Sequence, residues 1–192
     1  VLRMLPILSC GENCAGCIHV NQAMRYSACA AHARFAAASR SGEGHRVEQE
    51  MLRVEQEGGV LRVLLNRPEK RNALSRALLK CIEDAFTEQA ANNSLLAAVI
   101  TGAGDKSFAA GGDLADLGTV RTPEATREMA AGARAALDAI RNFPLPVIAA
   151  LNGDALGGGA ELAVACDFRV AAAHARIGFL QSRLNISSAW GG

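Results

Sequence analysis

The chain has 192 residues, of which 50% are hydrophobic and 20% are charged, a composition typical of one globular domain or one domain plus a tail. The 20 basic and 19 acidic side chains give a formal net charge of +1, which argues against a nucleic acid or a membrane surface as partner because either favours a basic excess. No segment approaches the roughly 18 consecutive apolar residues that span a bilayer.

Residues 1–50 differ in composition from the rest and contain four of the six cysteines and three of the four histidines. The C-x3-C-x2-C spacing of their first three cysteines is that of radical-SAM iron–sulfur enzymes, but Gly16 stands where that family has an aromatic residue. Residues 13–42 contain no acidic side chain and resemble an organellar transit peptide, which would place the protein in mitochondria.

A third interpretation of this head is that it is not part of the native protein. The chain begins with Val1, whereas Met51 opens a well-patterned segment, which favours a misassigned start or translated upstream sequence. The location would then be cytoplasmic, as in bacteria. We expect the head to be poorly ordered.

From residue 51 onward, short apolar runs alternate with segments of helical periodicity, which predicts an α/β domain. Taken in chain order, we expect strands at 51–57 and 60–66 joined by a Gly-Gly turn, a helix from the cap at Ser75 to about residue 91, a strand at 95–101, a Gly-rich loop at 102–112, a helix at 122–142, a strand at 146–150, a second Gly-rich loop at 152–159, a helix at 158–166, and strands at 168–172 and 177–179.

Each Gly-rich loop follows a buried strand and precedes a helical segment, where free amide groups can bind a ligand. Neither loop matches the phosphate-binding or dinucleotide-binding glycine patterns, and no G-x-S-x-G motif occurs. The chemistry must therefore rest on backbone amides and a carboxylate. Two glycine loops can direct two N–H groups at one oxygen, and one such donor stabilises a transition state by about 3–4 kcal/mol.

Glu161 lies one helical turn after Gly158 and can serve the same cavity as a general base or acid. The alternative is that the three glycines at 157–159 only allow a helix to pack closely on a strand and that Glu161 is solvated.

Three stretches, residues 65–74, 108–114 and 155–167, carry a resemblance to the enoyl-CoA hydratase/isomerase (crotonase) superfamily, which extends from residue 51 to residue 192. The resemblance implies a ββα spiral core and an acyl-CoA thioester as substrate. It implies no separate cofactor, since coenzyme A is part of the substrate, and a homotrimer or hexamer as the assembly.

The resemblance also implies the site. The amides of Gly112 and Gly158 would hold the thioester oxygen of an enolate, and Glu161 would be the acid/base residue. The coenzyme A contacts that it implies are Lys70, Arg71, Ala73, Ala110, Asp113, Leu114 and Ala115. From the residues alone, Asp113 is expected to cap the short helix that follows it.

One position departs from the hydratase pattern. Gln181 stands where hydratases of this family have a second glutamate, and an amide cannot exchange a proton at neutral pH, although it can orient a water. The chain is therefore expected to hydrate with Glu161 alone and less efficiently. The alternative is decarboxylation of a malonyl-type thioester (methyl- or ethylmalonyl-CoA), in which the departing CO2 generates the enolate and a neutral neighbour suits a substrate carboxylate.

A third function class also stays open at this stage. The family continues beyond the point that corresponds to residue 192 with helices that complete the acyl pocket, so the chain is expected to be an incomplete domain, and an inactive fragment that only self-associates is the alternative. No metal-ligand spacing occurs after residue 51. Cys81 and Cys166 are expected to be reduced core residues, and Trp190 is expected to be a packing residue.

Overall fold

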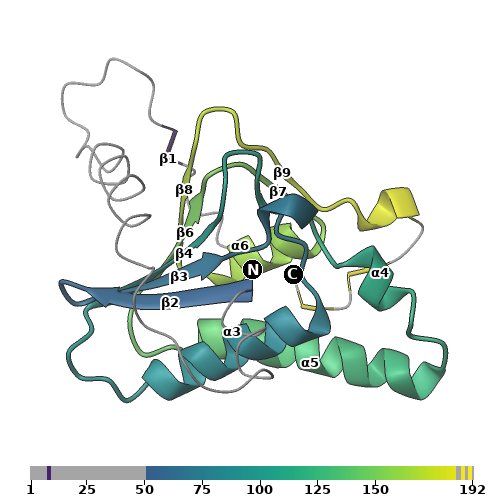
Figure 1. Ribbon diagram of the computed structural model, residues 1–192, viewed down its shortest axis with the longest axis horizontal. Helices are drawn as coiled ribbons and strands as arrows, with labels where there is room; N and C mark the ends of the chain where they lie inside the picture. The colour runs from purple at the N-terminus through teal and green to yellow at the C-terminus, as the bar shows by residue number, and fades with distance from the viewer. Residues whose placement is uncertain (1–7, 10–50, 185–186, 189, 192) are drawn as a thin grey trace, which may run out of the picture.

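The computed structural model (Figure 1) describes residues 8–9, 51–184, 187–188 and 190–191. The elements in chain order are β1 (Leu8–Ser9), β2 (Leu52–Glu57), β3 (Val60–Leu65), η1 (Pro68–Lys70), α3 (Arg76–Gln89), β4 (Ala97–Gly102), β5 (Ser107–Ala109), α4 (Leu114–Leu117), α5 (Pro123–Arg141), β6 (Val147–Leu151), β7 (Asp154–Leu156), α6 (Gly158–Ala165), β8 (Phe168–Ala171), β9 (Ile177–Gly178) and η2 (Gln181–Leu184), where η denotes a short 3₁₀ helix.

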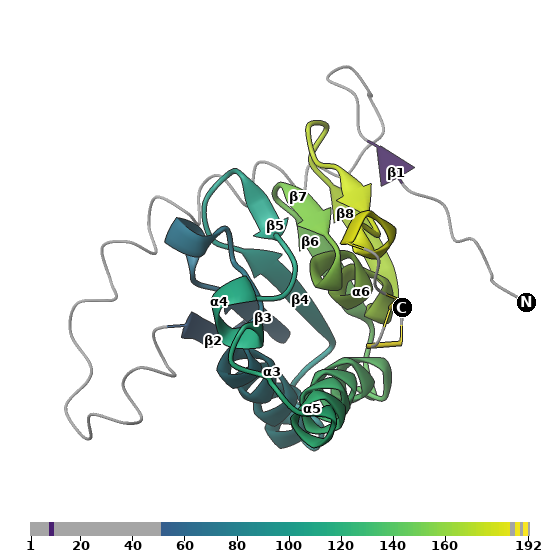
Figure 2. The ribbon, with the colours of Figure 1, turned by 90° about the vertical axis from the view of Figure 1, so that its right-hand side faces the viewer.

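The described part of the chain winds as a spiral in which pairs of strands alternate with helices. Strands β2 and β3 and the first strand of each later pair (β4, β6 and β8) belong, with β1, to a six-stranded sheet in the order β1-β8-β6-β4-β3-β2. The second strands form a separate sheet in the order β5-β7-β9. Only the β2–β3 pair is antiparallel among the described pairs. Figure 2 shows both sheets from the side of α4 and α5. The predicted ββα spiral is confirmed.

The predicted elements that do form agree with the structure to within two residues at each end. The hairpin of β2 and β3 turns at Gly58 and Gly59, whose φ angles of +55° and +80° lie in the left-handed region that glycine adopts without a steric cost. This places Leu61, Val63 and Leu65 on the buried face of β3.

Helices α3 and α5 run side by side along one side of the six-stranded sheet (Figure 1). Ser75 caps α3 as predicted, because its side chain accepts a hydrogen bond from the amide of Leu78 at 3.3 Å. Phe86 of α3 packs edge to face against Phe143, with ring centroids 5.2 Å apart. The helical layer therefore closes the hydrophobic core against the sheet.

The prediction that 102–112 and 152–159 are loops without strands is wrong, because β5 and β7 lie within them. Each of these strands has only three residues, which is too short for alternation to be visible in the sequence. Phe108 of β5 is fully buried, so the second sheet is anchored in the core.

Of residues 1–50, only Leu8–Ser9 is described, and it pairs in parallel with Val170 and Ala171 of β8. The sequence did not predict this strand. All other expectations for the head, including its cysteine spacing, its resemblance to a transit peptide and its lack of order, lie outside the described residues.

The loop between β3 and α3 is held by one buried asparagine. Asn72 has a φ of +55°, and its Oδ1 accepts a hydrogen bond from the amide of Arg67 at 3.0 Å. Its Nδ2 donates to the carbonyl oxygens of Ala103 at 3.0 Å and Ser107 at 2.8 Å. One side chain therefore joins this loop to the connection between β4 and β5.

We predict that Asn72→Ala lowers the free energy of unfolding by about 2–4 kcal/mol, since one buried polar group left without a partner already costs about 1–3 kcal/mol. Urea titration followed by circular dichroism measures the loss. The exposed Asn93 provides the matched control, and Asn93→Ala should shift the midpoint little. Equal midpoints for the two variants would contradict the role of Asn72.

Candidate active site

Two neighbouring strands of the smaller sheet bring the two Gly-rich segments together. Strands β5 and β7 are parallel, with Ser107 opposite Asp154 and Ala109 opposite Ala155. Segments that follow parallel neighbours leave the sheet at the same end. A Cβ on Gly111 would accordingly lie 3.1 Å from the carbonyl oxygen of Leu156.

The amide of Gly112 is presented by an extended segment. Leu74 donates its N–H to the carbonyl of Gly111 at 2.8 Å, and its own carbonyl accepts from the amide of Asp113 at 2.9 Å. Because successive N–H groups alternate in direction along an extended backbone, the N–H of Gly112 points away from Leu74. It is therefore available to a group on the opposite side.

Asp113 fixes this segment through a buried ion pair. Its Oδ2 lies 2.7 Å from Nη2 of Arg67, and both side chains are 9% exposed. Its Oδ1 accepts from the amides of Ala115 and Asp116 and caps α4, which confirms the predicted cap. The hydrogen bond from Arg67 and those from the amides hold the pKa of Asp113 below its usual value, against the effect of burial.

Gly158 and Gly159 begin α6 where it approaches β5 most closely. A Cβ on Gly159 would lie 2.8 Å from the carbonyl carbon of Ala109, so close packing explains that glycine. Gly158 is the first residue of the helix, so its N–H has no carbonyl partner within the helix. Gly159 therefore serves close packing, and Gly158 offers a backbone N–H that has no partner within its helix.

Glu161 lies one turn further along α6 and is 2% exposed, so the alternative that it is solvated is wrong. Its Oε2 accepts a hydrogen bond from Nε2 of Gln181 at 3.0 Å. Its Oε1 accepts one from the hydroxyl of Ser188. Oε1 of Gln181 is buried and has no hydrogen-bond partner among the described residues. Glu161 and Gln181, which were both predicted as catalytic residues, are thus in direct contact.

The indole of Trp190 lies against both glycines of the predicted site. A Cβ on Gly158 would come within 2.7 Å of Cη2 of this ring, and a Cβ on Gly112 would lie 3.6 Å from the same atom. The ring is 6% exposed, so Trp190 is a packing residue, as predicted. That it packs on these two glycines, and that Ser188 binds Glu161, was not foreseen, because residues 180–191 show no periodic pattern.

The residues predicted to contact coenzyme A lie close to one another. The carbonyl of Arg71 accepts a hydrogen bond from the amide of Ala110 at 3.0 Å, and the carbonyl of Ala73 accepts one from Arg67. Nζ of Lys70 lies 4.0 Å from Oδ2 of Asp113. Leu114 and Ala115, the remaining two, are exposed at the start of α4. Their contacts with coenzyme A stay predictions.

A cavity of about 210 Å³ adjoins this loop and is lined by two basic side chains, Arg71 and Lys106. Its other lining residues are Pro68, Asn72, Ala103, Gly104, Asp105 and Ser107. Lys106 was not among the predicted site residues. Its position as a basic residue within a Gly-rich loop was the available signal.

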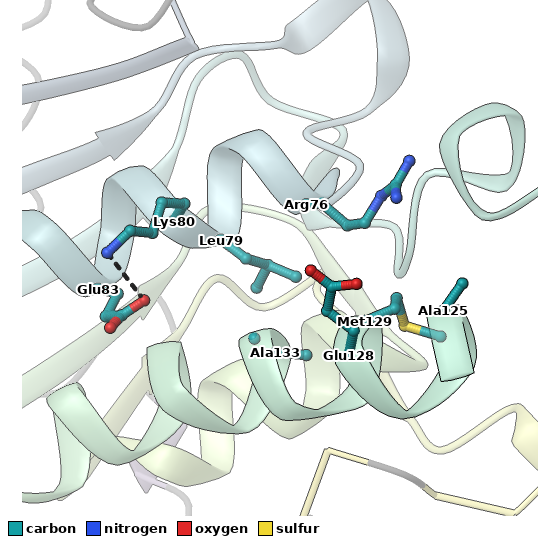
Figure 3. Close-up of a pocket in the computed structure, with 9 residues that line it drawn as sticks. Arg76, Leu79, Lys80, Glu83, Ala125, Glu128, Met129 and Ala133 are labelled. Carbon is teal, nitrogen blue, oxygen red and sulfur yellow. Dashed lines mark ion pairs between the residues drawn. The ribbon is translucent and has the colours of Figure 1, made fainter. Parts of the chain in front are cut away.

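A second cavity of about 230 Å³ lies between α3 and α5 (Figure 3). Its rim is charged, and Lys80 forms an ion pair with Glu83 at 3.3 Å across one side of it. The side chains of Leu79 and Met129 contribute to its apolar lining. None of the predicted catalytic residues lines this cavity, so it is separate from the candidate site.

Burial raises the pKa of the Cys166 thiol to about 12, so this cysteine is a protonated core residue, as predicted. Within residues 51–184 and the other described positions, no three His, Cys, Asp or Glu side chains are grouped to hold a metal ion. No helix in the described part of the chain is both long and apolar enough to cross a membrane.

We predict that Asp113→Asn lowers the free energy of unfolding at neutral pH by about 3–5 kcal/mol, because it leaves the buried Arg67 without its counter-charge while asparagine can still cap α4. Since the folded-state pKa of Asp113 is lowered, its contribution is fully present above the ordinary aspartate pKa of about 3.9 and is lost as the pH falls through the folded-state value.

Urea titrations at several pH values between neutrality and acid measure the free energy of unfolding and test this prediction. The difference in the free energy of unfolding between the wild type and Asp113→Asn should become smaller in acid. Both proteins will still lose stability there, because the pKa values of Asp116 and Asp154 are also lowered. Asp84→Asn, at an exposed ion pair, is the matched control and should cost no more than about 1 kcal/mol. A difference between the wild type and Asp113→Asn in the free energy of unfolding that does not change with pH would contradict the prediction.

Comparisons with known proteins agree with this geometry. The family model for enoyl-CoA hydratase/isomerase matches residues 55–192. The chain is 41% identical over 143 residues to crotonyl-CoA hydratase of Syntrophomonas wolfei, covering 74% of this chain and 55% of the relative. It is 35% identical over 167 residues to mitochondrial methylglutaconyl-CoA hydratase of Mus musculus, covering 85% of this chain and 53% of the relative.

Among solved structures, the fold is similar to that of an enoyl-CoA hydratase from Bacillus anthracis, with a TM-score of 0.70 and 37% identity over 73% of this chain and 55% of that one. The chain spans about half the length of the curated relatives it matches. On these matches and on the site described above, the chain belongs to the enoyl-CoA hydratase/isomerase family.

Proposed function

We propose that this chain binds a short-chain 2-enoyl-CoA thioester and catalyses the addition of water to its double bond. The observation that carries the proposal is the placement of buried Glu161 one helical turn from Gly158, whose neighbour Trp190 also borders Gly112. Relatives named crotonyl-CoA hydratase and short-chain-enoyl-CoA hydratase support the substrate class.

In this proposal, the thioester oxygen accepts hydrogen bonds from the amides of Gly112 and Gly158. Attack on the β carbon moves the electrons of the double bond onto that oxygen, so the negative charge develops where the two N–H groups point. Backbone donors that are already in place need no reorganisation, and each stabilises the transition state by about 3–4 kcal/mol.

Glu161 supplies the proton transfers. As the water oxygen bonds to the β carbon, Glu161 takes one proton from the water, and the enolate forms on the thioester. The protonated Glu161 then returns that proton to the α carbon, the enolate collapses to the thioester, and the carboxylate is restored. One carboxylate therefore balances the whole addition.

In this proposal Gln181 and Ser188 position Glu161 and do not transfer protons themselves. Each donates a hydrogen bond to a different carboxylate oxygen, which fixes the orientation of the side chain. Every carboxylate oxygen can accept more than one hydrogen bond, so the water can still bind to Glu161. The amide at position 181 thus holds the base without serving as a second acid.

The coenzyme A part of the substrate would bind along the loop that contains Lys70 and Arg71, beside the cavity that Arg71 and Lys106 line. Arginine and lysine side chains are the usual partners of phosphate groups. No cofactor besides this substrate takes part in the proposal. We also propose, from the family resemblance, a homotrimer or hexamer located in the cytoplasm, or in mitochondria if the head is a transit peptide.

Decarboxylation of a malonyl-type thioester receives no support from the relatives, which are named as hydratases and a dehydratase. The side chain of Glu161 also opposes it, because a carboxylate one turn from Gly158 would repel a substrate carboxylate bound beside the same amide.

We predict that Glu161→Gln lowers kcat for hydration by about 10²- to 10⁴-fold, the usual contribution of a positioned general base, and leaves the binding of a saturated acyl-CoA nearly unchanged. Loss of the enoyl absorbance measures hydration, and equilibrium dialysis with butanoyl-CoA measures binding.

Glu88→Gln is the matched control, since Glu88 lies exposed on α3, and it should hydrate at the wild-type rate. Hydration by Glu161→Gln at the wild-type rate would show that another group is the base. Loss of both binding and hydration in that variant would show that Glu161 has a structural role only.

A further inference from the structure

Trp190 is the single tryptophan of the chain, and it lies where the proposed reaction takes place. Its ring contacts Gly158 so closely that a Cβ there would come within 2.7 Å of Cη2, and it also reaches Gly112. The ring is 6% exposed, so it fills the space beside both glycines rather than lying over them in solvent.

The turn that carries this ring is attached to α5. Nη2 of Arg141 donates a hydrogen bond to the carbonyl of Gly191 at 2.7 Å, and Nη1 of the same guanidinium lies 2.8 Å from Oδ1 of Asp138. Gly191 has a φ of +95°, a conformation that side chains other than glycine rarely adopt. The ring is therefore held in place from outside the catalytic residues.

We propose that Trp190 is a specificity-determining residue that selects acyl-CoA thioesters without a substituent on the α carbon. The inference rests on the proposed function, in which the amides of Gly112 and Gly158 hold the thioester oxygen. The α carbon lies only two bonds from that oxygen, so a ring in contact with both glycines borders the α carbon directly.

The physical reason is steric. A methyl group on the α carbon needs volume that the six-membered ring of Trp190 already fills, and an indole that is buried on two backbone segments cannot move aside without losing those contacts. An unbranched α carbon leaves only hydrogen atoms toward the ring. Discrimination should therefore depend on the size of the side chain at position 190.

The test compares but-2-enoyl-CoA with its 2-methyl analogue in the wild-type chain and in Trp190→Ala. The wild type should prefer the unbranched substrate in kcat/KM by about 10- to 200-fold, the range that one carbon in a shaped pocket provides. In Trp190→Ala this ratio should fall at least about tenfold, mainly through improved use of the branched substrate. Trp190→Phe should give an intermediate ratio.

Two further variants separate selectivity from folding. Phe179→Ala removes an exposed aromatic side chain from the same part of the chain and should leave the ratio unchanged. Arg141→Gln removes the hydrogen bond to the turn and should lower the ratio while the full ring is retained. If Trp190→Ala does not fold, the substrate ratios of Trp190→Phe and Arg141→Gln still test the role of Trp190. A ratio that is the same in every variant overturns the proposal.

Binding measurements separate this proposal from the proposed function. Butanoyl-CoA should change the fluorescence of the single tryptophan, whereas 2-methylbutanoyl-CoA should bind at least about tenfold more weakly by equilibrium dialysis, and Trp190→Ala should remove that difference. Selective binding without hydration would contradict the proposed reaction and support the role of Trp190. Equal binding of both thioesters would overturn the role of Trp190 alone, and binding of neither would overturn both.

Discussion

The buried ion pair between Arg67 and Asp113 is the constraint on which the site depends. It joins the loop after β3 to the segment that carries Gly112, 46 residues further along the chain. The same aspartate caps α4, and the carbonyl of Gly111 accepts the N–H of Leu74, so the segment is fixed both before and after Gly112. A buried charge without its partner is strongly unfavourable. The two segments must therefore stay in the positions that keep this pair formed.

The smaller sheet then determines what lies opposite that segment. Because β5 and β7 are parallel neighbours, the chain leaves both strands at the same end, and α6 begins there. The close approach of Gly159 to Ala109 lets the first turn of α6 reach β5, and Glu161 is buried one helical turn after Gly158. The arrangement suits charge stabilisation by preorganised backbone amides, with proton transfer by one carboxylate.

Much of this could be predicted from the sequence, for physical reasons that vary between elements. The hairpin and the caps at Ser75 and Asp113 follow from local backbone chemistry, so they were predictable. Strands β5 and β7 have three residues each and leave no visible period. The contacts of Ser188 and Trp190 depend on where a segment without periodicity crosses the fold, which no local pattern encodes.

The central claim is that Gly112, Gly158 and Glu161 form one enolate-stabilising site. The most direct test is incubation of the chain with but-2-enoyl-CoA in deuterium oxide, with the product analysed by mass spectrometry and nuclear magnetic resonance. We predict a product with a hydroxyl group on the β carbon and a deuterium on the α carbon, formed with multiple turnovers. A thioester that binds but remains unchanged, with neither hydration nor exchange at the α carbon, would contradict the claim.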